Sequence, residues 1–376
     1  MAIDYVEIRD SYTNLLGIVD TANSIIWHSV YFGVGDFEIY IKASTEIIEL
    51  LQVGNLVTRP DDLEVGIIEK INIADNPQDG MMVTATGRFA KSLLDRRIIY
   101  NLSGNVNTPT IMQGNVEEEV RRVVEENAIN CHFDNRRNIP LLALGNLAWL
   151  PHEIVDENGD PAAKQASCQN LLTFTDALLQ EYGLGSTVIL DADAGLLRYV
   201  VYMGSDRSWD NEAGYDPIVF SKDYDNMTSS VYEYDAATEK TAALIGGAGE
   251  DVERFYSLIA GEREGLERRE MWVDAASMNR TYKDENDVEH TYTDSEYRTM
   301  LNAAGKQQLV ANTAKETFDG AIDIQNSRWQ YNRDFALGDI VTTQNDDIGK
   351  FVNVRLREVL EVQDENGYSI DAVIQV

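Results

Sequence analysis

The sequence of 376 residues predicts a mainly β protein with α+β insertions. Apolar and polar residues alternate in several short stretches near both ends of the chain, and this period of two is typical of strands with one buried face. From residue 106 to residue 205 the apolar residues follow a helical period instead, which is typical of amphipathic helices. The pairs Asp79-Gly80 and Asn366-Gly367 are hairpin-turn signals between alternating stretches.

Residues 1–105 are predicted to form a first antiparallel β domain. The clearest strand is the second half of the stretch Trp27–Lys42, where Phe37 faces the core and Gly35 marks a bend or a close backbone approach. The other predicted elements are strands at Tyr5–Arg9, Leu15–Asp20, Val65–Ile73 and Met81–Phe89 and a short helix at Glu46–Leu51. The alternation in the third of these strands places on one face Val65, Ile67, Glu69, Ile71 and Ile73. Strands this short favour a small barrel or a sandwich.

Residues 106–205 are predicted to form a middle α/β domain. One helix begins after Asn115, which is a predicted N-cap, with Glu118 completing a capping box. A second helix covers about Cys168–Tyr182 and ends at Gly183. The strands Thr187–Leu190 and Leu196–Met203 follow and are predicted to pair as a hairpin.

Residues 206–376 are predicted to form a second β domain with a helical insertion at about 293–315. The helix begins at Thr293, and Glu296 completes a capping box. The predicted strands are Ile218–Ser221, Ser229–Tyr234, Thr241–Ile245, Asp339–Thr343, Phe351–Val362 and Tyr368–Val376.

The charge balance argues against a protein that binds nucleic acid or anionic membranes. The chain has 64 acidic and 31 basic residues, so its formal net charge is −33. Such a chain should repel phosphate groups, although the acidity can also serve solubility or a saline habitat alone. The first ten residues lack the pattern of a signal peptide, and the most apolar segment, Leu141–Leu150, is shorter than a bilayer span. The sequence therefore predicts synthesis in the cytoplasm and no membrane segment.

No motif builds an active site, so the sequence predicts no catalytic residue, no cofactor and no bound metal. Gly246–Gly249 lacks the ending of a phosphate-binding loop, and His152 lacks the second histidine of a zinc protease motif. Two cysteines, Cys131 and Cys168, make no disulfide framework. Asp156-x-Asn158 and Asp284-x-Asn286 leave weak binding of a cation at the surface open.

Three groups of residues, in order along nearly the whole chain, carry a family resemblance. The first contains Trp27, Tyr31, Gly35-Asp36-Phe37-Glu38, Glu64–Glu69, Gly87-Arg88 and Leu93-Leu94-x-Arg96-Arg97. The second is Gly265–Ala275, which includes Arg268, Arg269, Glu270 and Asp274. The third is Tyr331-x-x-Asp334-Phe335-x-Leu337-Gly338-Asp339-Ile340-Val341. Together they resemble the hub, or tail-tip base, proteins of long-tailed bacteriophages, and specifically the siphophage group related in fold to the baseplate hub of T-even phages.

The resemblance implies a structural, non-enzymatic protein of the virion. It implies that three copies form a ring at the end of the tail tube, and that each copy carries two tube-like β-barrels. The homotrimer would then present pseudo-sixfold symmetry to a hexameric tube ring. The barrels would be residues 1–105 and 206–376. The implied partners are the tail tube or distal tail ring protein and the receptor-binding or tip proteins, and DNA would pass through without specific binding.

The charged residues have a role in this interpretation. An acidic lumen would repel DNA phosphate and leave no binding minimum along the path. Arginine suits fixed pairing with carboxylates across a packed contact, although pairing within one copy is an equal alternative. The structural or interface candidates are Trp27, Gly35, Phe37, Arg88, Arg96, Arg97, Arg268, Arg269, Glu270, Asp274, Asp334, Gly338 and Asp339.

Two alternatives stay open. One is the hub of a phage-like contractile injection particle, which the sequence does not distinguish from a phage hub. The other is a tail-tip adhesin that binds glycans of the host surface through exposed aromatic residues such as Trp209, Tyr215 and Tyr224.

Overall fold

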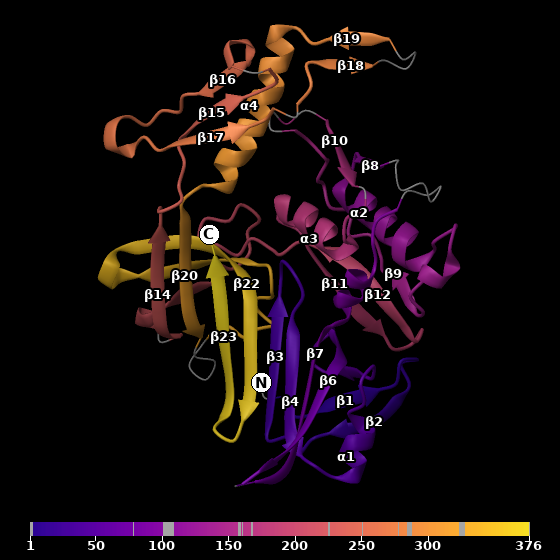
Figure 1. The fold of residues 1–376 in the computed structure, drawn as a ribbon. Helices are drawn as coiled ribbons and strands as arrows, with labels where there is room; N and C mark the ends of the chain where they lie inside the picture. Colours follow the sequence, from indigo (N-terminus) through magenta and orange to yellow (C-terminus); the bar gives the residue numbers. More distant parts are fainter. Residues whose placement is uncertain are drawn as a thin grey trace. The chain divides into compact units, whose positions relative to one another are not determined.

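The computed structural model is mainly β, as the sequence predicts (Figure 1). It describes residues 3–77, 79–100, 109–156, 159, 161–166, 168–224, 226–249, 251–276, 278–283, 288–322 and 328–375. Among these residues no sheet closes into a barrel. The chain forms two compact units. The first comprises Met1–Asp156, Pro161–Val231 and Phe318–Val376, and the second comprises Glu157–Asp160 and Tyr232–Thr317. The predicted division at residues 105 and 205 stays a prediction.

The first unit is built on a thirteen-stranded sheet that takes strands from both ends of the chain. Its amino-terminal strands are β1 (Val6–Arg9), β2 (Leu15–Val19), β3 (Ser24–Val30), β4 (Asp36–Lys42), β5 (Leu56–Thr58), β6 (Val65–Asn76) and β7 (Gly80–Phe89). Its carboxy-terminal strands are β13 (Val219–Ser221), β14 (Met227–Asp235), β20 (Lys315–Ile322), β21 (Ile340–Asn345), β22 (Lys350–Asp364) and β23 (Gly367–Gln375). The order is β14-β20-β23-β22-β3-β4-β7-β6-β5-β1-β2, and β21 pairs with β22 and with β13.

The stretch Trp27–Lys42 lies at the centre of this sheet, where it forms most of the hairpin β3–β4. On the other side of β3 lies β22, and Trp27 is the register partner of both Phe37 and Glu361. Trp27 and Phe37 are buried, as the alternation predicts. The two ends of the chain are therefore joined by backbone hydrogen bonds of a single ladder.

The prediction that five residues of Val65–Ile73 share one face is wrong. The register of β6 against β7 shifts between Ile68 and Lys70, and an extra residue at such a bulge moves the following side chains to the other face. Ile68 is fully buried, and Ile73 is 44% exposed.

Helices and two small sheets complete the first unit. The helices are α1 (Thr45–Leu50), α2 (Val116–Val124) and α3 (Leu171–Glu181), and α2 and α3 lie beside β11 in Figure 1. Asn115 caps α2 by accepting a hydrogen bond from the Glu118 N–H, as predicted. The small sheets contain β9 (Leu142–Leu144), β11 (Gly185–Asp191) and β12 (Leu196–Tyr202), and β8 (Thr110–Gln113) and β10 (Ala163–Ala166). The predicted hairpin is β11–β12.

The second unit packs one helix on a three-stranded sheet. The strands are β15 (Ala242–Gly246), β16 (Tyr256–Ile259) and β17 (Glu270–Asp274), with a hairpin of β18 (Thr281–Lys283) and β19 (Glu289–Thr291). The helix α4 (Asp294–Ala311) begins with the predicted capping box of Thr293 and Glu296. Tyr297 and Leu301 of α4 pack against Ile245.

Short turns of tighter or wider helix connect these elements. They are η1 (Ala90–Arg96), η2 (Glu125–Ile129), η3 (Asn135–Arg137), η4 (Lys222–Tyr224), η5 (Asp251–Glu253), η6 (Gly265–Glu267) and η7 (Asp346–Ile348). In the described part of the chain, no helix combines the length and the apolar character that crossing a membrane requires.

Candidate functional site

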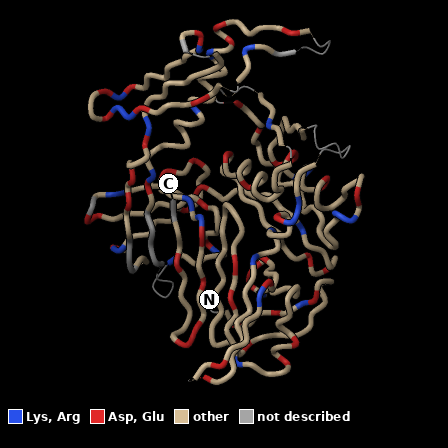
Figure 2. The backbone as a smooth tube through the Cα atoms, in the orientation of Figure 1, with Lys and Arg blue, Asp and Glu red and all other residues tan. Residues whose placement is uncertain are grey.

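One face of the central sheet carries charged side chains beside apolar ones such as Ile26 and Leu360, and we call it the polar face. In β3 and β4 alternate residues are buried, and the residues between them point to the opposite face. Figure 2 shows acidic positions along the strands of this sheet. The acidic side chains on the polar face belong to Asp36, Glu38, Glu358, Asp364 and Asp371, and the basic ones to Lys42, Lys70 and Arg88. Acidic groups therefore outnumber basic ones on this face.

A histidine joins the two halves of the polar face. His28 on β3 lies between a carboxylate of β4 and one of β22: its Nδ1 is 3.3 Å from Asp36 Oδ2 and its Nε2 is 3.1 Å from Glu358 Oε2. Side chains from the two ends of the chain thus meet on this face as well as in the backbone ladder.

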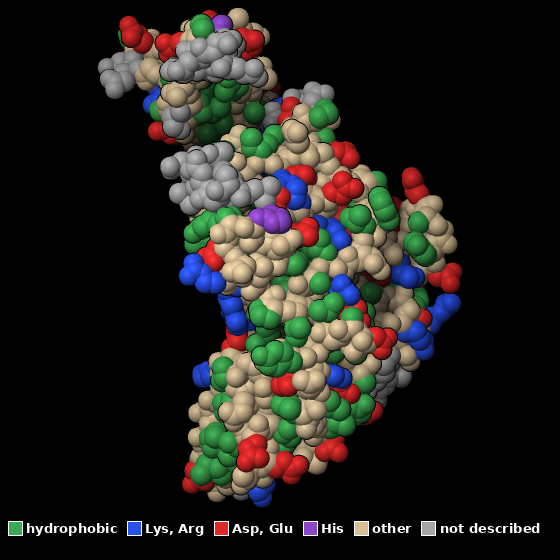
Figure 3. Space-filling model, turned by 90° about the vertical axis from the view of Figure 1, so that its right-hand side faces the viewer, with side chains coloured by type: hydrophobic (Ala, Val, Ile, Leu, Met, Phe, Trp, Pro, Cys, Tyr) green, Lys and Arg blue, Asp and Glu red, His purple; other side chains and the backbone are tan. Residues whose placement is uncertain are grey.

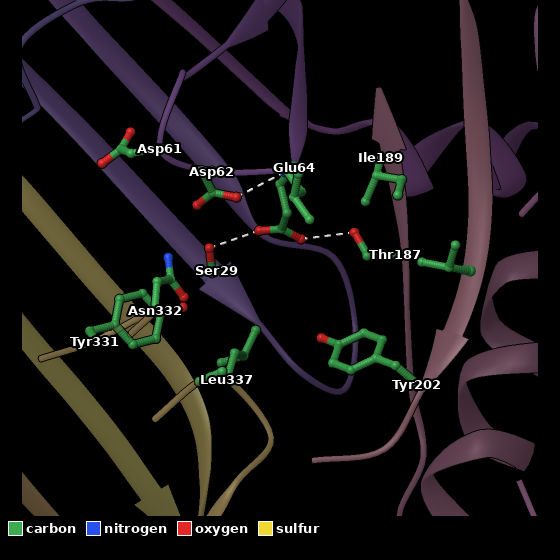
Figure 4. A pocket seen from close by; sticks show the side chains of 13 residues that line it. Ser29, Asp61, Asp62, Glu64, Thr187, Ile189, Tyr202, Tyr331, Asn332 and Leu337 are labelled. Atoms are coloured by element: carbon green, nitrogen blue, oxygen red, sulfur yellow. Dashed lines mark hydrogen bonds between the residues drawn. The ribbon is translucent and has the colours of Figure 1, made fainter. Parts of the chain in front are cut away.

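On the other side of β3 lies a pocket of about 470 Å³ (Figure 4). Its lining comes from three regions far apart in the sequence. The first supplies Ser29 and Asp61–Glu64, the second supplies residues between Thr187 and Tyr202, and the third supplies residues between Tyr331 and Leu337. Asp61, Asp62 and Glu64 give it three carboxylates, and none of the lining residues is Lys or Arg.

Hydrogen bonds fix the two carboxylates that face into this pocket. Glu64 accepts from Ser29 Oγ at 2.7 Å and from Thr187 Oγ1 at 3.0 Å, so it links the first β region to β11. Asp62 accepts from Trp27 Nε1 at 3.1 Å and from the Glu64 N–H at 2.8 Å. Burial, followed by the charge of Asp62, raises the pKa of Glu64 to about 7. Burial likewise raises the pKa of Asp62.

A buried arginine compensates the carboxylates next to the pocket. Arg59 is 4% exposed and forms paired hydrogen bonds with Asp61 at 3.0 and 2.8 Å and with Glu361 of β22 at 2.9 and 3.2 Å. Its guanidinium also lies 5.4 Å from the ring centre of Trp27. Arg59 thereby ties the loop before β6 to the carboxy-terminal strand β22.

Replacing Glu64 by glutamine should make the protein more stable at pH 8. Because the folded-state pKa of about 7 exceeds the ordinary value of 4.5, the folded state retains a proton that the unfolded chain loses between these values. Stability should therefore fall as pH rises from about 4.5 to 7. At pH 8 the variant should gain about 1–3 kcal/mol, since the pocket is open to water and the full shift is not realised. Urea unfolding of the wild type and the variant at several pH values measures this difference in the free energy of unfolding.

Glu69→Gln is the matched control. The hydrogen bond from Arg88 lowers the pKa of Glu69, so ionisation of this group favours the folded state. Its amide variant should lose stability at pH 8 rather than gain it. Equal effects of the two variants would show that the environment of Glu64 is not the cause.

The structure places the predicted candidates of the first unit in different surroundings. Arg88 pairs with Glu69 at 2.9 Å and with Asp95 at 3.2 Å, and Arg96 Nη2 lies 3.6 Å from Glu69. Within the described part of the chain, Arg97 donates to main-chain carbonyls alone, those of Arg137 and Arg96. A Cβ at Gly35 would lie 2.0 Å from the His28 carbonyl, which explains the glycine there.

The candidates of the third motif form a turn next to β21. Asp334 pairs with Arg333 at 2.7 Å. Gly338 has a φ of +93°, and Asp339 accepts from the N–H groups of Ser205 and Ala336. These three residues fix the conformation of the main chain after Tyr331, which itself lines the pocket.

The candidates of the second motif lie in the second unit. Arg268 donates to Glu270 at 2.7 Å, Arg269 lies 3.4 Å from Glu239, and Asp274 accepts from Arg254. Pairing within one chain is therefore present for Arg88, Arg268 and Arg269, and their role between copies stays a prediction.

Sequence reasoning missed the network in which the buried Arg59 pairs with Asp61 and Glu361. Two signals were available. The run RPDDLE at Arg59–Glu64 concentrates four charged residues in a turn, and Glu361 occupies an inward position of β22 in phase with Val359. A charged residue in an apolar phase indicates a buried partner of opposite charge.

The described residues contain no group of three or more His, Cys, Asp or Glu side chains that could hold a metal ion. Asn158, Asp284 and Asn286, from the two possible cation motifs, lie outside the described residues. The predicted exposure of Trp209, Tyr215 and Tyr224 is confirmed.

Comparison with known proteins gives a family and a fold. Residues 5–374 match the profile of the family described as siphovirus ReqiPepy6 Gp37-like protein. No protein of curated function resembles the chain closely enough to count as a match.

Two solved structures share the fold over nearly their whole length. The 43 kDa tail protein of prophage MuSo2 from Shewanella oneidensis has 11% identity and a TM-score of 0.58, covering 99% of this chain and 98% of that one. The tail protein from Neisseria meningitidis has 12% identity and a TM-score of 0.56, covering 99% of this chain and 96% of that one.

Proposed function

Because the chain belongs to the siphovirus Gp37-like family of phage tail proteins, we propose that three copies form the hub ring that joins the tail tube to the tail tip. Membership of the family indicates a location in the tail of the virion. In this proposal the protein is structural rather than catalytic, and DNA passes through the ring during ejection.

The order of strands in the central sheet is the observation that carries this proposal. Four strands from the carboxy-terminal region, β14-β20-β23-β22, continue directly into four from the amino-terminal region, β3-β4-β7-β6. The two quartets are joined where Glu358–Gln363 of β22 pairs with Ile25–Val30 of β3. Two similar quartets in each copy give six in a trimer, which supports pseudo-sixfold symmetry. In the ring each quartet would be the wall of one tube-like barrel.

The edges of the eight strands support closure of the ring between copies. β14 is the last strand of the order. From Lys70 to Asn76 the described part of β6 pairs with β7 alone, so its other edge is free there. In the proposed ring the free edge of β6 pairs with β14 of the next copy, which satisfies the backbone groups of both.

The polar face of the eight strands would line the channel. On β3, β4, β6, β7, β22 and β23 its acidic side chains outnumber its basic ones, and carboxylates along a channel repel DNA phosphate. The basic groups on this face are neutralised in part: Arg88 pairs with Glu69 and Asp95. A path on which carboxylates outnumber cations would let DNA move without a binding minimum.

The mass of the purified protein in solution tests the ring. Light scattering over a concentration series should approach three times the 42.2 kDa of one chain. Glycan arrays probed with the same sample test the adhesin, whose exposed aromatic residues Trp209, Tyr215 and Tyr224 are its support. A monomer at every concentration would reject the ring, and glycan binding by the same sample would favour the adhesin.

A further inference from the structure

Trp149 combines two unusual properties. Its φ is +60°, in the left-handed region, and its side chain is 78% exposed. A bulky residue in this region is strained, because its Cβ approaches the main chain. A large aromatic side chain in water also forgoes the burial that usually stabilises it. Neither property contributes to the stability of the folded chain.

Polar side chains of α2 hold the main chain on both sides of Trp149. Glu117 is 1% exposed, and its two carboxylate oxygens accept from the N–H groups of Ala148 at 2.7 Å and Leu150 at 3.0 Å. Asn115 Nδ2 donates to the Leu150 carbonyl at 2.8 Å.

The segment just before Trp149 is held from the same helix. Arg121, which is 7% exposed, donates to the carbonyls of Gly145 at 2.7 Å and Asn146 at 3.2 Å. Strained backbone persists where the surroundings fix it in this way, and it concentrates at functional positions. The hydrogen bonds from Glu117, Asn115 and Arg121 hold the loop in a conformation in which the indole of Trp149 is exposed to solvent.

A groove of about 630 Å³ on the first unit has the character of a receptor for such a side chain. Its floor is apolar, with Leu56, Ile67, Leu93 and Leu197, all of them buried. Tyr12 and Val53 lie at its mouth and are exposed. Figure 3 shows apolar side chains between basic ones on the side of the molecule where β1 and β2 lie.

Two arginines line this groove and differ in their partners: Arg96 Nη2 lies 3.6 Å from Glu69, which also lines the groove, whereas Arg97 has no carboxylate partner among the described residues. The Arg97 guanidinium donates to the main-chain carbonyls of Arg137 and Arg96. A guanidinium over an indole face is a favourable contact, strongest of all for tryptophan.

We propose that Trp149 of one copy inserts into the groove of a neighbouring copy, between the apolar floor and Arg97. The contact joins two different surfaces of the same chain, which is the kind of contact that generates closed rings. It rests on the proposed ring and names one of its contacts. Tryptophan and arginine are also the residues that most often dominate the binding energy of interfaces.

Trp149→Gly separates docking from folding. Glycine adopts a positive φ without strain, so the melting temperature should rise or stay unchanged. Self-association measured by sedimentation should weaken at least tenfold. The matched control is Trp209→Ala, which removes a tryptophan that is 61% exposed and should alter association less than twofold. Association of Trp149→Gly at the wild-type level would overturn the proposal.

A cross-link identifies the groove as the receptor. Two variants with Cys168→Ser, one carrying Trp149→Cys and the other Val53→Cys, are mixed and oxidised. Each has one introduced cysteine, so a covalent dimer of the two must join different copies, and this dimer is the expected product. If the wild type is a trimer but no cross-link forms and Trp149→Gly has no effect on association, the proposed hub is retained and this contact is rejected. A wild-type monomer would reject both.

Discussion

Replacing Arg59 by methionine should lower the free energy of unfolding by about 3–5 kcal/mol at pH 7, because removing one partner of a buried ion pair leaves the other charge uncompensated. Arg59 and Glu361 are both nearly inaccessible to solvent, at 4% and 3% exposure. Without the guanidinium, Glu361 and Asp61 keep their charges close to Asp62. Urea unfolding of the wild type and the variant measures the loss.

Two further measurements assign this loss to the charges. The deficit should shrink at pH 5, where the uncompensated carboxylates take up protons more readily. A second replacement, Glu361→Met, should restore part of the stability of Arg59→Met, since a buried pair replaced by apolar side chains is often neutral. Additive losses in the double variant would mean that the two side chains act independently, and the proposed tie between the loop and β22 would be wrong.

Local patterns in the sequence predict much of this fold. The hairpin β22–β23 forms at Asn366-Gly367, and the helix α4 begins with the capping box of Thr293 and Glu296, because both signals act over a few residues. The pairing of β3 with β22 has no such signal. It joins residues more than three hundred positions apart, and only the packing of both strands on one core selects it.

The bulge in β6 shows the limit of periodicity within a single strand. A strict alternation predicts one face for Val65 to Ile73, but the insertion between Ile68 and Lys70 changes the face half-way along. A glycine in the neighbouring strand accommodates it: a Cβ at Gly87 would lie 1.8 Å from the Ile67 carbonyl. The close approach of two backbones requires the partner strand, so one strand's sequence could not reveal it.

The candidate site was harder to predict than the fold, because its residues come from three separate segments. Ser29, Thr187 and Tyr331 are ordinary residues in their local sequence, and only the tertiary structure brings them to Glu64. Trp149 was missed for a related reason. Its exposure and positive φ depend on Glu117 and Arg121 of α2, and the sequence around it reads only as an apolar segment.

Trp27 joins the amino-terminal strands, the pocket and the buried arginine. It is fully buried, with ring centres 4.7 Å from Phe89 and 5.9 Å from Phe37. Its Nε1 donates to Asp62, and the guanidinium of Arg59 lies over its ring. Because β3 is the strand that pairs with β22, a loss of packing here acts on the junction between the two halves of the central sheet.

Trp27→Ala should therefore destabilise the protein by about 3–5 kcal/mol, from lost burial and the cavity left behind. Trp27→Phe keeps an aromatic ring and removes mainly the hydrogen-bond donor to Asp62. It should therefore lower the free energy of unfolding by less, about 1–3 kcal/mol. Trp27→Ala and Arg59→Met should also be less than additive when combined, since each removes the contact between the Arg59 guanidinium and the Trp27 ring. Urea unfolding of the single and double variants measures the coupling. If Trp27→Ala and Trp27→Phe cost the same, the hydrogen bond to Asp62 rather than the packed ring would hold the junction.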